Sequence, residues 1–171
     1  MESTLEGIVR DLVGRVLFEE VVVEALKEEN IKFLREEEYS ALAGVVYDFR
    51  ADFVIPDAEN PIAFIEVRKS SSRHASLYAK DKMFSAINWK GQHRNIIGII
   101  VVEGDWTKAT LECMAKVFDY VIPLHQSQFM ARVIKRALEG DESVLKWLID
   151  FRINENPKYL GTSDTLLQQT K

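Results

Sequence analysis

The chain has 171 residues, 47% of them hydrophobic and 29% charged, so it is long enough for one sizeable core and short for two. Its formal net charge of -5 argues against a protein that coats nucleic acid by bulk electrostatics, although a local basic surface is compatible with it. No apolar run approaches the roughly 20 residues that span a bilayer, and the N-terminus lacks the pattern of a secretory signal. We therefore expect a cytoplasmic protein with no membrane partner.

The first half of the chain predicts one long helix and a β-hairpin. Apolar residues at helical spacing, separated by Glu and Lys, predict a helix over residues 4–28, and a short strand is expected at 31–34. Strands are also predicted at 49–56 and 62–69, because both segments are rich in β-branched and aromatic residues and flank the turn formers of 57–61. Apolar side chains on both strand faces indicate a sheet that is covered on both sides.

The second half predicts an alternation of helices and strands. The near-continuous apolar run of residues 95–102, ended by Gly104, is typical of a central strand. Cys113 lies in an apolar helical pattern and is expected to be buried. The other elements are a helix at 73–89 ended by Gly91, helices at 107–117, 127–138 and 142–151, and a strand at 120–124. We expect one α/β domain over residues 1–153, a central mixed sheet flanked by helices, and a polar tail at 154–171.

The predicted hairpin brings two carboxylates together. If its turn is centred on Glu59, Val54 lies opposite Phe64. The same register places Asp52 opposite Glu66, with Cβ atoms about 4.5–5.5 Å apart. Two acids among apolar neighbours repel each other, so a cation should balance them. A divalent ion on oxygen ligands would do so, and one cysteine with three scattered histidines offers no zinc spacing.

A salt-bridge cluster is the alternative to a metal at this position. The same register places Arg50 opposite Arg68, on the same sheet face as the two acids because strand side chains alternate. The two arginines could then neutralise Asp52 and Glu66 without any metal.

Two segments carry a recognisable motif, Arg50-Ala51-Asp52-Phe53-Val54-Ile55 and Ile62-Ala63-Phe64-Ile65-Glu66-Val67-Arg68-Lys69-Ser70. Together with the order of elements over residues 5 to 124, they resemble the PD-(D/E)xK nuclease superfamily. In that family an acid opens the second strand and an acid-x-Lys tripeptide ends the third. The resemblance implies a restriction-endonuclease-like three-layer fold and an endonuclease that hydrolyses DNA phosphodiester bonds with Mg²⁺ or Mn²⁺.

Residue by residue, the resemblance implies that Asp52 and Glu66 are metal ligands. An acid of the first helix occasionally supplies a third ligand, and the candidates are Glu19, Glu20 and Glu24, of which Glu20 is carried forward. Asp57 follows a proline as in the motif name, but it lies in the predicted turn, so Asp52 is preferred.

The position of the usual catalytic lysine is occupied by Arg68. Arginine stays protonated and cannot act as a general base, although it can hold a phosphate or stabilise developing negative charge. Lys69 should point to the opposite sheet face. Family members can supply the lysine from a neighbouring element, and Lys80 or Lys82 on the following helix could reach back over the strand.

Basic residues gather between positions 50 and 94, which suggests a surface for DNA. The candidate contacts are Arg50, Ser70, Arg73 and Lys80, although helix capping alone would explain the serine. A nuclease of this size is expected to form a homodimer in order to cut both strands of a duplex. The rival hypotheses are a DNA-binding or regulatory subunit with weakened catalysis, favoured by Arg68, and an assembly scaffold, favoured by internal salt bridges.

Overall fold

A computed structural model describes residues 2–71 and 74–156 and arranges their strands in one five-stranded sheet. The strands, in spatial order, are β1 (Leu34–Arg35), β2 (Phe53–Ile55), β3 (Ala63–Ser70), β4 (Ile97–Gly104) and β5 (Tyr120–Pro123). The first three are antiparallel neighbours, whereas β4 and β5 run parallel to β3. The predicted mixed sheet is therefore confirmed, with the 95–102 run as its parallel core strand β4.

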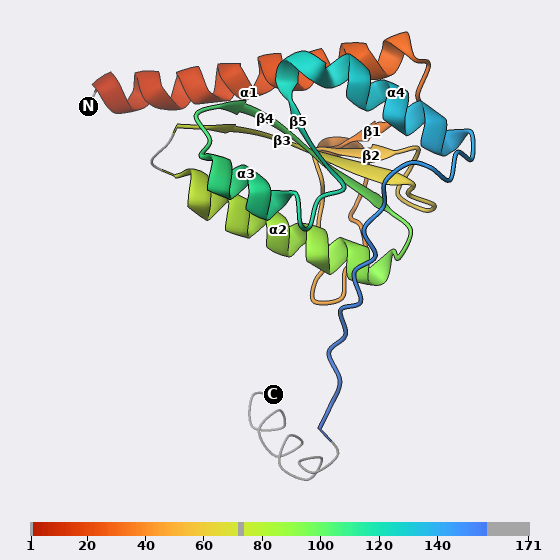
Figure 1. Ribbon diagram of the computed structural model, residues 1–171. Coiled ribbons are helices and arrows are strands. Elements are labelled where there is room, and N and C mark those ends of the chain that lie inside the picture. The colour runs from red at the N-terminus through yellow and green to blue at the C-terminus, as the bar shows by residue number, and fades with distance from the viewer. Residues whose placement is uncertain (1, 72–73, 157–171) are drawn as a thin grey trace.

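Helices cover both faces of this sheet (Figure 1). The described helical segments are α1 (Glu2–Glu28), the 3₁₀ turn η1 (Glu36–Glu38), α2 (Ala75–Gln92), α3 (Lys108–Met114), the 3₁₀ turn η2 (Leu124–Gln126) and α4 (Ser127–Leu138). Helices α1 and α4 pack on one face, and α2 and α3 on the other. None of the described helices combines the length and apolar character needed to cross a bilayer.

Strand alternation divides the core into two layers. Phe53 and Ile65 face α1 and α4, whereas Val54 and Phe64, their neighbours in the chain, face α2. All four side chains are fully buried. A residue of β3 that shares the parity of Phe64 therefore lies beneath α2, and this parity decides which helix can contact Glu66.

The end of α1 explains why the first strand begins later than predicted. Asn30 has φ 55°, its N–H donates to the Lys27 carbonyl, and the N–H of Ile31 donates to the Leu26 carbonyl. These two bonds form a Schellman cap, with Asn30 in the left-handed position. Ile31 belongs to this cap and is buried, so β1 starts only at Leu34 rather than at residue 31.

Two local predictions are wrong for a simple geometric reason. Helix α2 does not stop at Gly91 but continues to Gln92, and the missing side chain of Gly91 admits Val45 and Phe151, which a Cβ atom would meet at 2.8 and 3.1 Å. Cys113 is exposed rather than buried. On the short helix α3 Met114 is the buried residue, and consecutive helical residues point about 100° apart.

The predicted helix at 142–151 is also wrong, because hydrogen bonds to Asp119 and Tyr120 hold this segment in an extended form. The N–H groups of Leu145 and Trp147 donate to Tyr120 Oη and Asp119 Oδ1. The chain passes from α4 across the end of the sheet towards α2 (Figure 1). Ten helical residues would span only about 15 Å, whereas an extended chain reaches about twice that distance.

Candidate metal centre

The hairpin of β2 and β3 places Asp52 beside Glu66. The pairing of Val54 with Phe64 confirms the register predicted from the turn. Continued by two residues, this register sets Asp52 opposite Glu66, and Asp52 Oδ2 accepts a hydrogen bond of 2.7 Å from the N–H of Val67. The negative charge of Asp52 raises the pKa of Glu66, as expected for two neighbouring carboxylates.

Glu66 is fully buried, and a lysine of α2 holds its carboxylate. Lys82 Nζ donates a hydrogen bond of 2.6 Å to Glu66 Oε2, whereas Oε1 has no hydrogen-bond partner. Burial, and to a lesser extent the charge of Asp52, raise the pKa of Glu66 to about 8, although Lys82 and Arg68 act to lower it. A buried carboxylate oxygen without a partner is costly, so this site favours an added proton or cation.

The variant Glu66→Gln is expected to flatten the pH dependence of stability of the metal-free protein. Folding raises the pKa of Glu66 from 4.5 to about 8, so the folded state keeps a proton that the unfolded chain releases. The resulting stabilisation is fully present below about pH 4.5 and is lost as the pH rises through about 8.

Urea titrations in EDTA between about pH 5 and 9 measure this effect as the free energy of unfolding. The wild type should lose stability relative to Glu66→Gln across that range. Parallel curves for the two proteins would contradict the raised pKa.

Asp52 is 7% exposed and is held from the other direction by α1. Arg15 Nη2 donates to Asp52 Oδ1 at 3.0 Å and to Glu36 Oε2 at 3.2 Å, and Arg15 Nε donates to Glu19 Oε1 at 3.0 Å. Sequence reasoning missed Arg15. A signal existed, because Arg15 lies two turns before the buried Val22, on the side of the helix where charge is rare without a partner.

The alternative to a metal, a salt-bridge cluster of the two acids with Arg50 and Arg68, does not form. Arg50 is exposed and donates to the Glu36 carbonyl at 3.4 Å. Arg68 is half-buried, its guanidinium carbon lies 5.2 Å from the centre of the Tyr78 ring, and its buried Nε has no hydrogen-bond partner. The acids are instead paired with cations from the two helical layers, α1 and α2.

Among the candidate lysines, Lys82 is the one that reaches the carboxylates. It lies on the buried side of α2, whereas Lys80 is exposed on the same helix. Lys69 points to the opposite sheet face, as expected, with Nζ 5.7 Å from the centre of the Phe18 ring of α1. Of the two lysines of α2 that could reach back over β3, Lys82 does so and contacts Glu66.

Glu20 and Ser70 have hydrogen-bond partners other than the carboxylate pair. The side chain of Glu20 is 51% exposed and accepts a hydrogen bond of 2.8 Å from Arg35 Nη1, so it is paired on the surface. Ser70 is buried, and its hydroxyl donates to the Ser71 carbonyl at 3.0 Å. Arg73 lies outside the described residues.

The donor set fits a hard divalent cation held by two carboxylates. Within residues 2–71 and 74–156 no group of three or more His, Cys, Asp or Glu side chains forms a metal-binding cluster. Two carboxylates match the number that magnesium commonly takes alongside water and substrate phosphate. Glu66 Oε1 lacks a partner, whereas Asp52 Oδ1 must share its lone pairs with Arg15 or release it.

Comparisons with known proteins do not assign this chain to a family. No family model matches the sequence, and neither curated proteins nor solved structures give a match. Functional inference for this chain therefore comes from its own side chains.

Proposed function

We propose that this chain is a metal-dependent nuclease of the PD-(D/E)xK superfamily, with a restriction-endonuclease-like fold, that hydrolyses DNA phosphodiester bonds with Mg²⁺ or Mn²⁺. The supporting observation is the convergence of Asp52, Glu66 and Lys82, in which the lysine lies 2.6 Å from one acid and the second acid stands opposite in the hairpin. These charged side chains lie among buried apolar residues, where charged groups are rare unless they have a function.

The proposed roles follow from charge and burial. Asp52 and Glu66 would hold the cation, which when bound would polarise a phosphoryl oxygen and make water more acidic. Lys82 keeps a positive charge against Glu66 and fixes the orientation of its carboxylate. Arg68 stays protonated and stabilises negative charge that develops on the scissile phosphate. Its stacking on Tyr78 restricts the guanidinium before substrate arrives.

The basic surface available to DNA is smaller than the count of basic residues suggests. Lys82 and Lys90 are buried and paired with Glu66 and Asp119. The exposed cations between positions 50 and 94 in the described chain are Arg50, Lys69, Lys80 and Arg94. A modest number of phosphate contacts is therefore expected, with affinity that falls as salt is raised.

Cleavage of supercoiled plasmid DNA tests this proposal most simply. Nicked and linear products should appear with Mg²⁺ or Mn²⁺ and should not appear when EDTA is present. Failure to cut duplex, branched or single-stranded DNA with either metal would contradict a nuclease.

A DNA-binding subunit with weakened catalysis is the second candidate. It is favoured by Arg68 at the position of the usual lysine and by the hydrogen bond that Arg15 donates to Asp52 Oδ1. The two candidates differ in what Arg68 does, so substitutions at this position separate them.

If Arg68 supports catalysis, Arg68→Lys should preserve or raise metal-dependent cleavage, because it keeps a cation beside the phosphate, and Arg68→Ala should abolish it. The measurement is the initial nicking rate, with DNA affinity determined in parallel. A wild type that binds DNA but stays inert, and that cuts once Arg68 becomes lysine, would favour the second candidate. Equal rates in all three proteins would remove Arg68 from the mechanism.

A further inference from the structure

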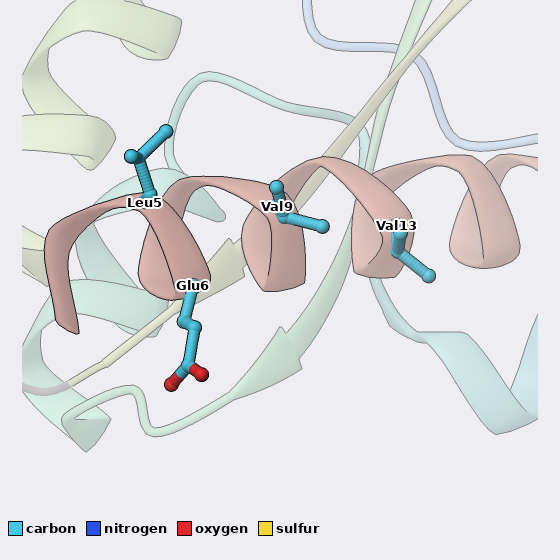
Figure 2. Close-up of a pocket in the computed structure, with 4 residues that line it drawn as sticks. All are labelled: Leu5, Glu6, Val9 and Val13. Carbon is cyan, nitrogen blue, oxygen red and sulfur yellow. The ribbon is translucent and has the colours of Figure 1, made fainter. Parts of the chain in front are cut away.

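A row of large aliphatic side chains on α1 is left uncovered by the rest of the described chain. Its members recur every four residues and are Leu5, Val9, Val13, Leu17 and Val21, exposed by 66%, 55%, 51%, 59% and 42%. Ile8 and Val16 widen the row and are 59% and 52% exposed. Figure 2 shows Leu5, Val9 and Val13 on successive turns of the helix, with Glu6 directed away from Leu5.

Among the described side chains of α1, those that contribute to the protein core lie in its second half, from Phe18 onwards. Of the described α1 side chains, Val22, Val23, Ala25 and Leu26 are buried. The N-terminal end of α1 runs out past the sheet (Figure 1). The apolar row therefore begins on turns that extend beyond the sheet and continues along the exposed side of α1 as far as Val21.

We propose that this row binds a second copy of the chain, so that two α1 helices cross in a two-fold symmetric dimer. Side chains spaced by four residues form a ridge along a helix. When the ridges of two helices interdigitate, the helix axes cross at about -50°, which is the commonest class of helix packing. The same row on two identical copies is self-complementary, as a two-fold interface requires. Val13 is the middle member of the row and lies nearest the symmetry axis.

The size of the apolar surface fits a dimer. The seven aliphatic side chains are each 42–66% exposed. Together they present roughly 600 Å² of apolar surface per copy, which is at the upper end of the size range for the largest apolar patch on a typical monomer. Two copies would bury roughly 1,200 Å² in total, which reaches the range of specific, stable interfaces.

Charge around the row disfavours a lipid surface as the occupant. The exposed charged side chains described on α1 are mainly acidic, with Glu6, Glu20, Glu24 and Glu28 against Arg15 and Lys27. Helices that lie on membranes carry mainly Lys and Arg on their polar side. The row does not include Arg15, the α1 residue that donates a hydrogen bond to Asp52. The dimer can therefore be tested without reference to the proposed nuclease activity.

Sedimentation velocity of the wild type and the double variant Val9→Glu with Leu17→Glu tests the interface. The wild type should sediment as a species of twice the 19.6 kDa chain mass, and the double variant as a folded monomer with an unchanged circular dichroism spectrum. The matched control is Leu77→Glu on α2, which is 63% exposed and outside the row. It should leave the dimer intact.

Disulfide trapping provides a second readout that does not depend on a destabilising charge. In a Cys113→Ser background, which removes the exposed native thiol, Val13→Cys should form a covalent dimer under mild oxidation, whereas Leu77→Cys should not. A wild type that is monomeric at roughly 100 µM, or a dimer that survives in the double variant, would overturn the proposal. So would a monomer that binds anionic vesicles through the same row.

Discussion

Asp52→Asn is expected to lower metal-dependent cleavage of DNA by roughly 10³-fold, because a catalytic metal contributes several kcal/mol to the transition state and each 1.4 kcal/mol is tenfold in rate. The amide keeps the shape of the side chain and an acceptor for the Val67 N–H, so the fold should survive. The matched control is Asp48→Asn, an exposed acid shortly before β2. Cleavage that falls equally in both variants would argue against a specific role for Asp52.

Lysines on one helix provide an internal comparison for the same site. Lys82→Met should reduce cleavage strongly, because it removes the cation that lies 2.6 Å from Glu66 Oε2, whereas Lys80→Met should change only the salt dependence of DNA binding. Rates and affinities measured together separate these effects. Full activity in Lys82→Met would argue against a role for Lys82 in cleavage.

The variant Asp119→Ala is expected to destabilise the protein by about 3–5 kcal/mol, the usual cost of breaking a buried ion pair. Lys90 Nζ donates to Asp119 Oδ2 at 2.6 Å and to the Ile96 carbonyl at 3.0 Å, and the N–H of Gly98 donates to the same Oδ2 at 2.6 Å. Both charged side chains are 0% exposed. Burial lowers the pKa of Lys90, and Asp119 opposes that shift.

Removal of Asp119 also releases the Trp147 N–H, which anchors the segment after α4. Urea titration of Asp119→Ala measures the total loss. The exposed pair of Lys108 and Glu112 supplies the control, because Glu112→Ala removes a carboxylate from a solvated salt bridge and should leave the midpoint almost unchanged. A loss below about 1 kcal/mol in Asp119→Ala would contradict the structural role of this pair.

The hairpin and the carboxylate pair could be predicted because they depend on local rules. Turn formers at 57–61 fix the centre of the hairpin, and a period of two then determines which residues share a face. The position of Lys69 on the opposite face and the reach of Lys82 over β3 follow from the same periodicities of strand and helix.

Arg15 escaped prediction because its partner is distant in the sequence. Asp52 lies 37 residues away, and nothing in helical spacing shows that α1 crosses the sheet at the start of β2. The acid of α1 expected near the metal, Glu20, instead pairs with Arg35. Long-range charge pairing, rather than the acidity of the helix, decides which of its residues approach the site.

The segment after α4 shows a limit of a different kind. Its apolar spacing suits a helix, but Asp119 and Tyr120 accept hydrogen bonds from its backbone and hold it extended. Tertiary partners thus outweigh local propensity. Such acceptors can be identified only when the three-dimensional position of β5 relative to the segment after α4 is known.

Metal binding by Asp52 and Glu66 is the central claim, and thermal melts with and without Mn²⁺ test it most directly. The wild type should be stabilised by mass action, by about 2.7 kcal/mol when free ion is 100 times its dissociation constant, and both Asp52→Asn and Glu66→Gln should lose that gain. Asp48→Asn should keep it. A wild type with no metal-dependent shift, or a shift that persists in both site variants, would contradict the claim and leave Arg15 and Lys82 as purely structural partners of the two acids.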